Sequence, residues 1–253
     1  MKTIGCWLML CLVWATGAQA HFGMVIPSRA IVTPAAKTLD LTLAFAHPAE
    51  VVGMEMAKPQ AFYMVTGGEK TNLLSSLTSA PVLGHDGWRS QVTFKRPGVY
   101  TFVVEPTPYW EPAEDVSIIH ISKTVVSVFG DDEGWDQPLG LKTEIVPLLR
   151  PFGNYAGNAF VGRVLVNGKP APHAKVEVER YNADKRMTPA SDLHVTQVVQ
   201  ADADGVFTFC CPLGGWWGFA ALSEADFTLK DPQGQDKPVE LGAVLWLWLD
   251  DVK

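Results

Sequence analysis

Thr38-Leu-Asp-Leu-Thr-Leu-Ala-Phe-Ala46 alternates apolar and polar residues along most of its length. This alternation is typical of a β-strand with one buried face. Comparable segments follow at Gln91–Phe94, Gly98–Glu105 and Val116–Phe129, and Gly-Gly, Asp-Gly and Pro-Gly pairs separate them. The 18 prolines and 22 glycines leave little room for long helices. The sequence therefore predicts an all-β protein.

The second half of the chain carries a different pattern of turns and strands. Asn167-Gly168-Lys169-Pro170 forms a turn signal before the alternating segment Ala174–Arg180, and Ala201–Gly205 precedes a short strand at Val206–Phe209. This arrangement resembles the small transthyretin-like modules of many exported proteins. We therefore expect two tandem β-sandwich domains: an immunoglobulin-like one over residues 21–150 and a transthyretin- or carboxypeptidase-regulatory-like one over residues 151–253.

The first twenty residues have the order of a secretory signal peptide. Lys2 is followed by the apolar run Ile4–Trp14 and then by Ala18-Gln19-Ala20. The apolar run is much shorter than the ~20 residues that a membrane-spanning helix needs. We expect residues 1–20 to be cleaved off after Ala20 and the mature protein to be periplasmic. The later apolar segment Leu241–Leu249 is also short and suits a buried strand, so no membrane span is expected in the mature form.

Composition excludes several classes of partner and scaffold. The formal net charge of −7 gives no basis for binding nucleic acid. Two of the four cysteines lie in the predicted signal peptide, and Cys210 and Cys211 are adjacent. Neighbouring cysteines rarely bridge each other because the intervening peptide would be strained. The fold is therefore not expected to depend on disulfides.

The histidines are the most informative polar residues. Cleavage after Ala20 would make His21 the first residue, and its α-amino group and Nδ1 could then chelate one metal ion, since the amine has an ordinary pKa near 8. His47 stands where a predicted strand ends, His120 lies within an apolar segment, and His85 lies in the predicted turn Gly84–Gly87. Each of these three, taken alone, is also compatible with a structural role. A buried ring requires a partner.

An acidic, proline-stiffened loop between two strands is the other unusual segment. It runs from Glu105 to Asp115 and contains Tyr109, Trp110, Glu111 and Glu114. Its carboxylates could orient ligand imidazoles, act as an acid/base pair, or form a solvated surface. No complete catalytic motif is present, so a binding protein is expected rather than an enzyme.

Several segments together resemble one family, DUF4198, whose members are exported proteins encoded with nickel and cobalt uptake systems. The matching segments span the whole mature chain: His21–Ser28, Phe45–Pro48, Pro108–Asp115, Ile118–His120, Phe129–Trp135, Lys142–Pro147 and Gly214–Ala220. The resemblance implies a periplasmic protein that binds Ni²⁺, or Co²⁺, and delivers it to an energy-coupling-factor type membrane transporter. It places the metal ligands on His21, His47 and His120, with His85 as a weaker fourth.

The residues themselves leave the metal and the class of protein open. Nitrogen ligands suit Ni²⁺, Cu²⁺ and Zn²⁺, and the intrinsic order favours copper over nickel. One alternative is a copper oxidase that acts on polysaccharides through an amino-terminal histidine brace, with Tyr109, Trp110, Trp216 and Trp217 as its substrate surface. Another is a non-catalytic adhesive or structural sandwich in which the histidines are incidental.

Overall fold

The structure is a computed structural model, and it describes residues 20–252. Strands dominate it, and its only helices within that range are two 3₁₀ turns, Leu74–Ser76 and Asp192–His194. The prediction of an all-β sandwich protein is confirmed. The predicted signal peptide lies outside the described residues, except for Ala20. None of the described helices is long and apolar enough to cross a membrane.

Three sheets make up the layers of the molecule, and we name them front, central and rear. The front sheet has five strands: β1 (Phe22–Pro27), β3 (Thr38–His47), β8 (His85–Thr93) and β7 (Thr78–Val82), in that order, with β4 (Val52–Met54) beside β3. The rear sheet has four strands: β12 (Thr143–Pro147), β14 (Ala159–Val166), β15 (Lys169–Pro170) and β18 (Val206–Cys210).

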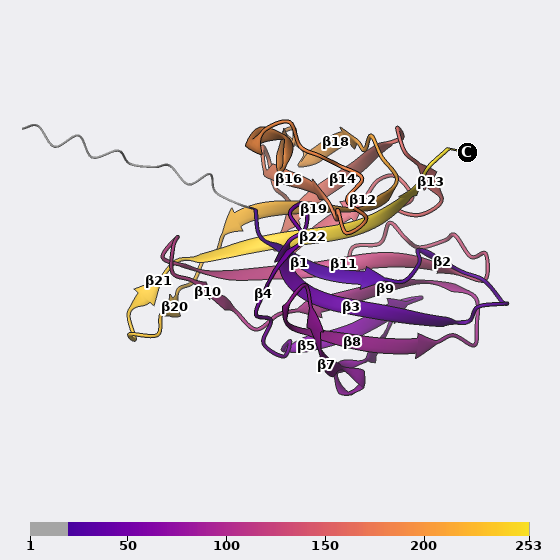
Figure 1. Ribbon diagram of the computed structural model, residues 1–253, viewed down its shortest axis with the longest axis horizontal. Coiled ribbons are helices and arrows are strands. Elements are labelled where there is room, and N and C mark those ends of the chain that lie inside the picture. The colour runs from indigo at the N-terminus through magenta and orange to yellow at the C-terminus, as the bar shows by residue number, and fades with distance from the viewer. Residues whose placement is uncertain (1–19, 253) are drawn as a thin grey trace, which may run out of the picture.

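The central sheet has eleven strands, eight of which form one continuous path. In spatial order these are β17 (Gln197–Gln200), β16 (Lys175–Arg180), β19 (Gly215–Glu224), β22 (Val239–Asp250), β11 (Val116–Val128), β9 (Gly98–Glu105), β5 (Ala61–Thr66) and β6 (Glu69–Asn72). Three short strands add to its sides: β10 (Tyr109–Glu111) and β2 (Ile31–Val32) pair with β11, and β13 (Asn154–Tyr155) pairs with β22. A separate hairpin, β20 (Leu229–Lys230) and β21 (Asp236–Lys237), projects at the end of the molecule that also carries β10 (Figure 1).

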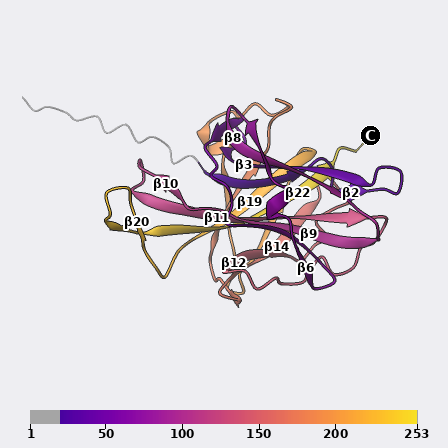
Figure 2. The same cartoon turned by 90° about the horizontal axis from the view of Figure 1, so that it is seen from below.

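The front and rear sheets cover opposite faces of the central sheet. Gly218 and Phe219 are neighbours in β19, so they face opposite sides. A Cβ on Gly218 would meet the rings of Phe22, from the front sheet, and of Trp246, whereas Phe219 contacts Phe160 of the rear sheet at 4.8 Å between ring centroids. Figure 2 shows β3 and β8 on one side of β11 and β22, and β12 and β14 on the other. The apolar core therefore lies in two layers, one on each face of the central sheet.

The last strand joins the two halves of the chain. β22 pairs in parallel with β11 from Ser117↔Val239 to Thr124↔Trp246, and it pairs antiparallel with β19 on its other side. The central sheet thus takes strands from both sides of the boundary predicted near residue 150. Whether the segments 21–150 and 151–253 fold as separate units remains a prediction.

Two local expectations are wrong in detail. His85 was expected in a turn, but the turn is Leu83–Gly84, where both residues have positive φ, and His85 begins β8 opposite Val82. The segment around Tyr109 was expected to be a loop, but Tyr109–Glu111 pairs with β11 as strand β10. In both segments, glycine or proline residues typical of turns stand next to the end of a strand, so the strand end was assigned to the turn.

Candidate metal-binding site

His21 and His47 meet because of the register between β1 and β3. Phe22 pairs with Ala46. His21, which precedes Phe22, therefore lies opposite His47, which follows Ala46. The two imidazole ring centroids lie 4.8 Å apart. Phe45 shares its face of β3 with His47, and its ring stacks on that of His21 at 5.5 Å. The strand pairing therefore brings together two histidines that are 26 positions apart in the sequence.

His120 reaches the same place from the central sheet. It pairs with Gly242 of β22, and a Cβ on that glycine would lie 2.3 Å from Cδ2 of the imidazole. The ring therefore occupies the space that a side chain at position 242 would take. Its centroid lies 5.8 Å from that of Phe45, edge to face. We refer to His21, His47 and His120 as the histidine cluster.

A second close approach holds the front sheet against His120. A Cβ on Gly23 of β1 would lie 2.4 Å from Oγ of Ser122 and 3.0 Å from Cβ of His120. Real Cβ atoms do not approach other atoms so closely, so β1 can pack here only because residue 23 is glycine. This contact places the start of β1, and with it His21, directly over β11.

Two carboxylates bind the outer nitrogens of two of these rings. Nε2 of His21 lies 3.2 Å from Oε2 of Glu111 on β10, and Nε2 of His120 lies 3.0 Å from Oε1 of Glu240 on β22. The contact of His120 with Glu240 is a hydrogen bond. Because an ionised carboxylate only accepts, Nε2 of His120 carries the proton. In the neutral imidazole, Nδ1 is then the basic nitrogen. The ring of His120 thus presents Nδ1 as its potential metal ligand.

The Nδ1 atoms of His120 and His47 have different surroundings. Nδ1 of His120 is buried and has no hydrogen-bond partner, on a residue that is 2% exposed. Nδ1 of His47 lies 2.9 Å from the carbonyl oxygen of Ala20. A buried polar atom without a partner is costly. The orphaned nitrogen of His120 is therefore the strongest local indication of a missing ligand.

The electrostatic surroundings of the histidine cluster favour a cation. Burial, and then the charges of His47 and His120, lower the pKa of His21 below its usual value, although Glu111 and Glu240 oppose this. Burial disfavours the charged form of Glu240, but its bond from His120 and the charges of His120 and His21 outweigh that effect and lower its pKa. The ring of His21 is therefore largely neutral at pH 7, beside an ionised carboxylate.

Two further carboxyl groups respond to the same charges. Burial and the neighbouring charges of Glu240 and Glu111 raise the pKa of Glu114. Burial and the charges of Glu240 and Glu114 raise the pKa of Glu177 to about 7. Because the pKa shifts arise from mutual repulsion as well as burial, a bound cation would stabilise the ionised forms of all these groups.

The loop after β3 is fixed by residues at the β16 end of the central sheet. The backbone NH of Ala49 donates to Oε2 of Glu179, at 3.1 Å, and that of Asn182 donates to the carbonyl of Pro48, also at 3.1 Å. These bonds anchor the chain immediately after His47. The position of His47 therefore depends on β16 and the segment that follows it, in the second half of the sequence.

His85, the predicted weaker fourth ligand, has a different partner. Its Nδ1 lies 3.1 Å from Oε1 of Glu55, and its side chain is 42% exposed. His173 and His194 are exposed. Of the four predicted ligands, the structure groups His21, His47 and His120, and it holds His85 against Glu55.

Within residues 20–252, no set of three or more His, Cys, Asp or Glu side chains already stands in a geometry that would hold a metal ion. The rings are near one another, but His47 is turned to the carbonyl of Ala20. The donor set suits a borderline metal such as Ni²⁺, Cu²⁺ or Zn²⁺. The cysteines suit it less, since burial raises the pKa of Cys211 and so disfavours its thiolate.

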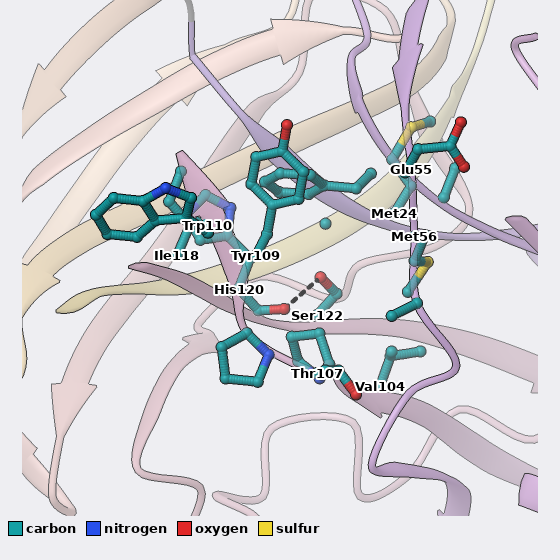
Figure 3. A pocket seen from close by; sticks show the side chains of 16 residues that line it. Met24, Glu55, Met56, Val104, Thr107, Tyr109, Trp110, Ile118, His120 and Ser122 are labelled. Carbon is teal, nitrogen blue, oxygen red and sulfur yellow. Dashed lines mark hydrogen bonds between the residues drawn. The ribbon is translucent and has the colours of Figure 1, made fainter. Parts of the chain in front are cut away.

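A mainly apolar pocket of about 240 Å³ adjoins the histidine cluster. Figure 3 shows Tyr109, Trp110 and His120 on one side of it and Met24, Glu55 and Met56 on the other. Phe45 also lines this pocket, and its ring lies 5.0 Å from that of Tyr109. Trp216 and Trp217, suggested as a substrate surface, are only 7% and 1% exposed and belong to the core.

Glu240 and Glu177 lie near the histidine cluster but were not among the predicted site residues. The available signal for Glu240 was its position as the one carboxylate immediately before the apolar run Leu241–Leu249. Glu177 gave no such signal, because it alternates with valines as any half-exposed strand residue does. The carboxylates of the 105–115 segment were considered as partners of ligand imidazoles, and Glu111 does contact His21.

Fold and site together define an all-β sandwich protein with a buried cluster of histidines and carboxylates. The chain belongs to the DUF4198 family, described as a domain of unknown function, whose model matches residues 18–225. No curated protein matches the sequence.

Several solved structures align with most of the chain. The D0–D1 domain of intimin is 8% identical and covers 91% of this chain and 100% of its own, with a TM-score of 0.25. The titin tandem A164–A165 is 8% identical, with 92% and 100% covered and a TM-score of 0.22. A putative carbohydrate-binding protein from Bacteroides uniformis is 9% identical, with 89% and 98% covered and a TM-score of 0.27.

Proposed function

We propose that this protein binds Ni²⁺, or Co²⁺, through His21, His47 and His120 and delivers it to a membrane uptake transporter. The observation that carries the proposal is a group of three neighbouring histidines, in which His47 and His120 both act on the charge of His21 and the buried Nδ1 of His120 has no partner. The choice of metal comes from the resemblance to DUF4198 proteins encoded with nickel and cobalt uptake systems. The same resemblance suggests a transporter of the energy-coupling-factor type.

The chemistry of the donors supports a carrier. Imidazole nitrogens bind Ni²⁺, and the carboxylates Glu111 and Glu240 would hold the rings by their outer nitrogens, as partners of metal-binding histidines commonly do. No thiolate is required, which favours reversible binding. The proposal includes export to the periplasm and removal of residues 1–20, after which the α-amino group of His21 adds a further nitrogen donor.

Calorimetric titration of Ni²⁺ into the processed protein, with the amino terminus confirmed by mass, tests the proposal. We expect one equivalent to bind, and His47→Ala to abolish that binding. His173→Ala is the matched control, since it removes an exposed histidine from the second half. The proposed function is wrong if the processed protein does not bind nickel. It is also wrong if the His47→Ala and His173→Ala variants bind nickel equally.

The same titration with Cu²⁺ addresses the main alternative. Copper generally binds nitrogen ligands more tightly than nickel does, so affinity alone does not distinguish a carrier from a copper enzyme. The copper-loaded protein is therefore incubated with a reductant and oxygen, and peroxide is measured. A carrier gives no peroxide above that of the His47→Ala variant, whereas an oxidase does.

A further inference from the structure

The pocket beside the histidine cluster is built like a site for an organic molecule. Its lining is mainly apolar and brings together the aromatic side chains of Phe45, Tyr109 and Trp110. Met24 and Met56 lie across it from Tyr109 and Trp110, and both methionines are buried (Figure 3). Aromatic rings and polarisable thioethers make favourable contacts with the ring of a ligand. The walls therefore suit a ring compound.

The volume of the pocket limits the size of its occupant. An engineered apolar cavity of ~150 Å³ holds one benzene molecule. The pocket has a volume of about 240 Å³, so it has room for one substituted ring or for two fused rings. An oligosaccharide or a peptide would extend well beyond its walls.

The charges at the pocket exclude an anionic ligand. Its lining lies within the described part of the chain and contains a carboxylate, Glu55, but no lysine or arginine. The backbone NH of Asp86 and the ring of His85 bind this carboxylate and lower its pKa, so it is ionised at pH 7. An anion would meet this charge without a partner, and a cation would lose its hydration in a mainly apolar site. The occupant is therefore uncharged.

Two hydroxyl groups of the lining have no hydrogen left to donate to an occupant. That of Ser122 donates to the carbonyl oxygen of His120 at 3.2 Å, and that of Thr107 donates to the carbonyl oxygen of Lys58 at 2.8 Å. Each hydroxyl has a single hydrogen, and both hydrogens are engaged. A ligand whose polar group only accepts hydrogen bonds gains little from either.

One acceptor at the pocket lacks a partner. Among the side chains that line it, all within residues 20–252, only His120 has a buried polar atom without a hydrogen-bond partner, and that atom is Nδ1. The Cδ2–Nε2 edge of the ring lies against Gly242 of β22, so the edge with Nδ1 and Cε1 faces the opposite side of β11. This is the side on which β10 pairs, with Tyr109 and Trp110. Nδ1 is therefore directed toward the pocket.

We propose that this pocket binds a small, uncharged ring compound that donates one hydrogen bond to Nδ1 of His120. Phenols and heteroaromatic compounds with an NH group have this chemistry. The inference goes beyond the proposed function and does not depend on it, since it requires no metal. Because both ligands use Nδ1 of His120, Ni²⁺ and the ring compound exclude each other there.

The test uses indole and indene in calorimetric titrations of the metal-free, processed protein at pH 8, where imidazole is neutral. The two molecules have the same shape, but only indole carries an NH donor. We expect indole to bind with a Kd of about 1 mM or lower, which a ligand of this size reaches with ordinary efficiency. No binding of either molecule would overturn the inference.

The variant His120→Phe isolates the hydrogen bond. Its phenyl ring keeps the shape of the wall and removes Nδ1, so the ratio of indole affinity to indene affinity should fall by about three- to tenfold, the range for one net hydrogen bond. Differences in hydrophobicity between the two molecules cancel, because both are compared in both proteins. An unchanged ratio would show that Nδ1 does not bind the occupant, and the inference would be wrong.

A variant at the rim locates the binding. Ala57 is an exposed residue of the lining, so Ala57→Trp fills the entrance without disturbing the core. We expect it to abolish indole binding and to leave the affinity for Ni²⁺ unchanged. The matched control is Ala203→Trp, which places the same side chain at an exposed position in the turn before β18 and should bind indole normally. Equal indole binding by the two variants would contradict the inference.

Nitrogen NMR gives a direct readout of the bond. The resonance of Nδ1 of His120 should move toward the range of a protonated nitrogen when indole is added, and it should stay in place with indene. A resonance that does not move at saturating indole would contradict the inference. Because these experiments contain no nickel, a failure of nickel binding would overturn the proposed function and leave the result for the pocket unchanged.

Discussion

Two buried polar groups on the same strand have opposite arrangements. His120 and Lys123 lie three positions apart on β11, so they face opposite sides of the central sheet. Lys123 donates to Oε2 of Glu144 at 3.0 Å, and the backbone NH groups of Leu139 and Gly140 also bind that carboxylate. Nδ1 of His120 has no partner. On the rear side the buried charges of Lys123 and Glu144 are paired with each other. On the front side Nδ1 of His120 is free to accept a hydrogen bond or bind a ligand.

This difference separates structural from functional burial. Burial lowers the pKa of Lys123, against the effect of Glu144, and no space for a ligand is needed because the two charges neutralise each other. On the front side, three histidines meet carboxylates whose proton affinities depend on one another. A group that is buried, incompletely partnered and surrounded by titrating neighbours is a candidate functional site.

The largest expected effect is on stability at the Lys123–Glu144 pair. Glu144→Ala leaves the ammonium of Lys123 buried without a counter-charge, and we expect a loss of roughly 3–5 kcal/mol in the free energy of unfolding. His120→Phe keeps the ring shape over Gly242 and removes an unsatisfied nitrogen, but it also removes the bond to Glu240, so we expect a smaller loss of about 1–3 kcal/mol. Urea unfolding measures both, and equal losses would contradict the comparison.

For metal binding the ranking reverses. His120→Phe is expected to weaken Ni²⁺ binding by more than about 100-fold, because a direct ligand should cost more than the 10–100-fold typical of its outer partners. The control is Phe94→Leu, a core change elsewhere in the front layer, which lowers stability but leaves the affinity unchanged. Nickel affinity that follows stability in both variants would show that the cluster is only structural.

The carboxylates should have a smaller effect on affinity. Glu240→Gln and Glu111→Gln remove the carboxylate charges beside Nε2 of His120 and His21, and each is expected to weaken nickel binding by roughly 10–100-fold. Glu224→Gln is a matched control, since this exposed residue pairs with Glu240 across β19 and β22. Equal effects at positions 224 and 240 would indicate general electrostatics instead of orientation of the ring.

The smallest expected effect is a change in pH dependence. Burial raises the pKa of Glu179 to about 7, although Thr196 and Ala49 bind its carboxylate and oppose the shift. The native state therefore holds this proton up to about pH 7, while the unfolded chain releases it near 4.5, so stability contributed here falls as pH rises between these values.

Glu179→Gln removes this titration. We expect the free energy of unfolding to fall less steeply with pH between 5 and 7, by at most about 1.4 kcal/mol per pH unit. Urea unfolding at several pH values measures the slope, and Glu69→Gln, at an exposed position on β6, is the control. A variant whose slope equals that of the native protein would show that Glu179 does not titrate in this range.

Much of the fold follows from local patterns in the sequence. The predicted strand Gly98–Glu105 has the observed bounds, and Val116–Phe129 differs from β11 by one residue. These segments carry their signal in their own alternation and in the glycines and prolines around them. The pairing of β22 with β11 was not predictable in this way, since it joins residues about 120 positions apart.

The site was predictable in its residue types and not in its geometry. His21 was singled out by its place after the predicted cleavage site, and the family resemblance implied His47 and His120 as further ligands. The pairing of β1 with β3 brings His21 and His47 together. The role of Glu240 depends on the parallel register of β11 and β22, which no local pattern encodes. The same holds for Gly242, whose importance is only the space that it leaves for the ring of His120.

The most direct test of the central claim is X-ray absorption at the nickel edge of the loaded, processed protein. The account predicts a first shell of nitrogen donors with the multiple-scattering pattern of two or three imidazoles, reduced by one imidazole in His120→Phe at saturating nickel. A first shell dominated by carboxylate oxygen or by sulfur from Cys210 or Cys211, unchanged in that variant, would contradict it.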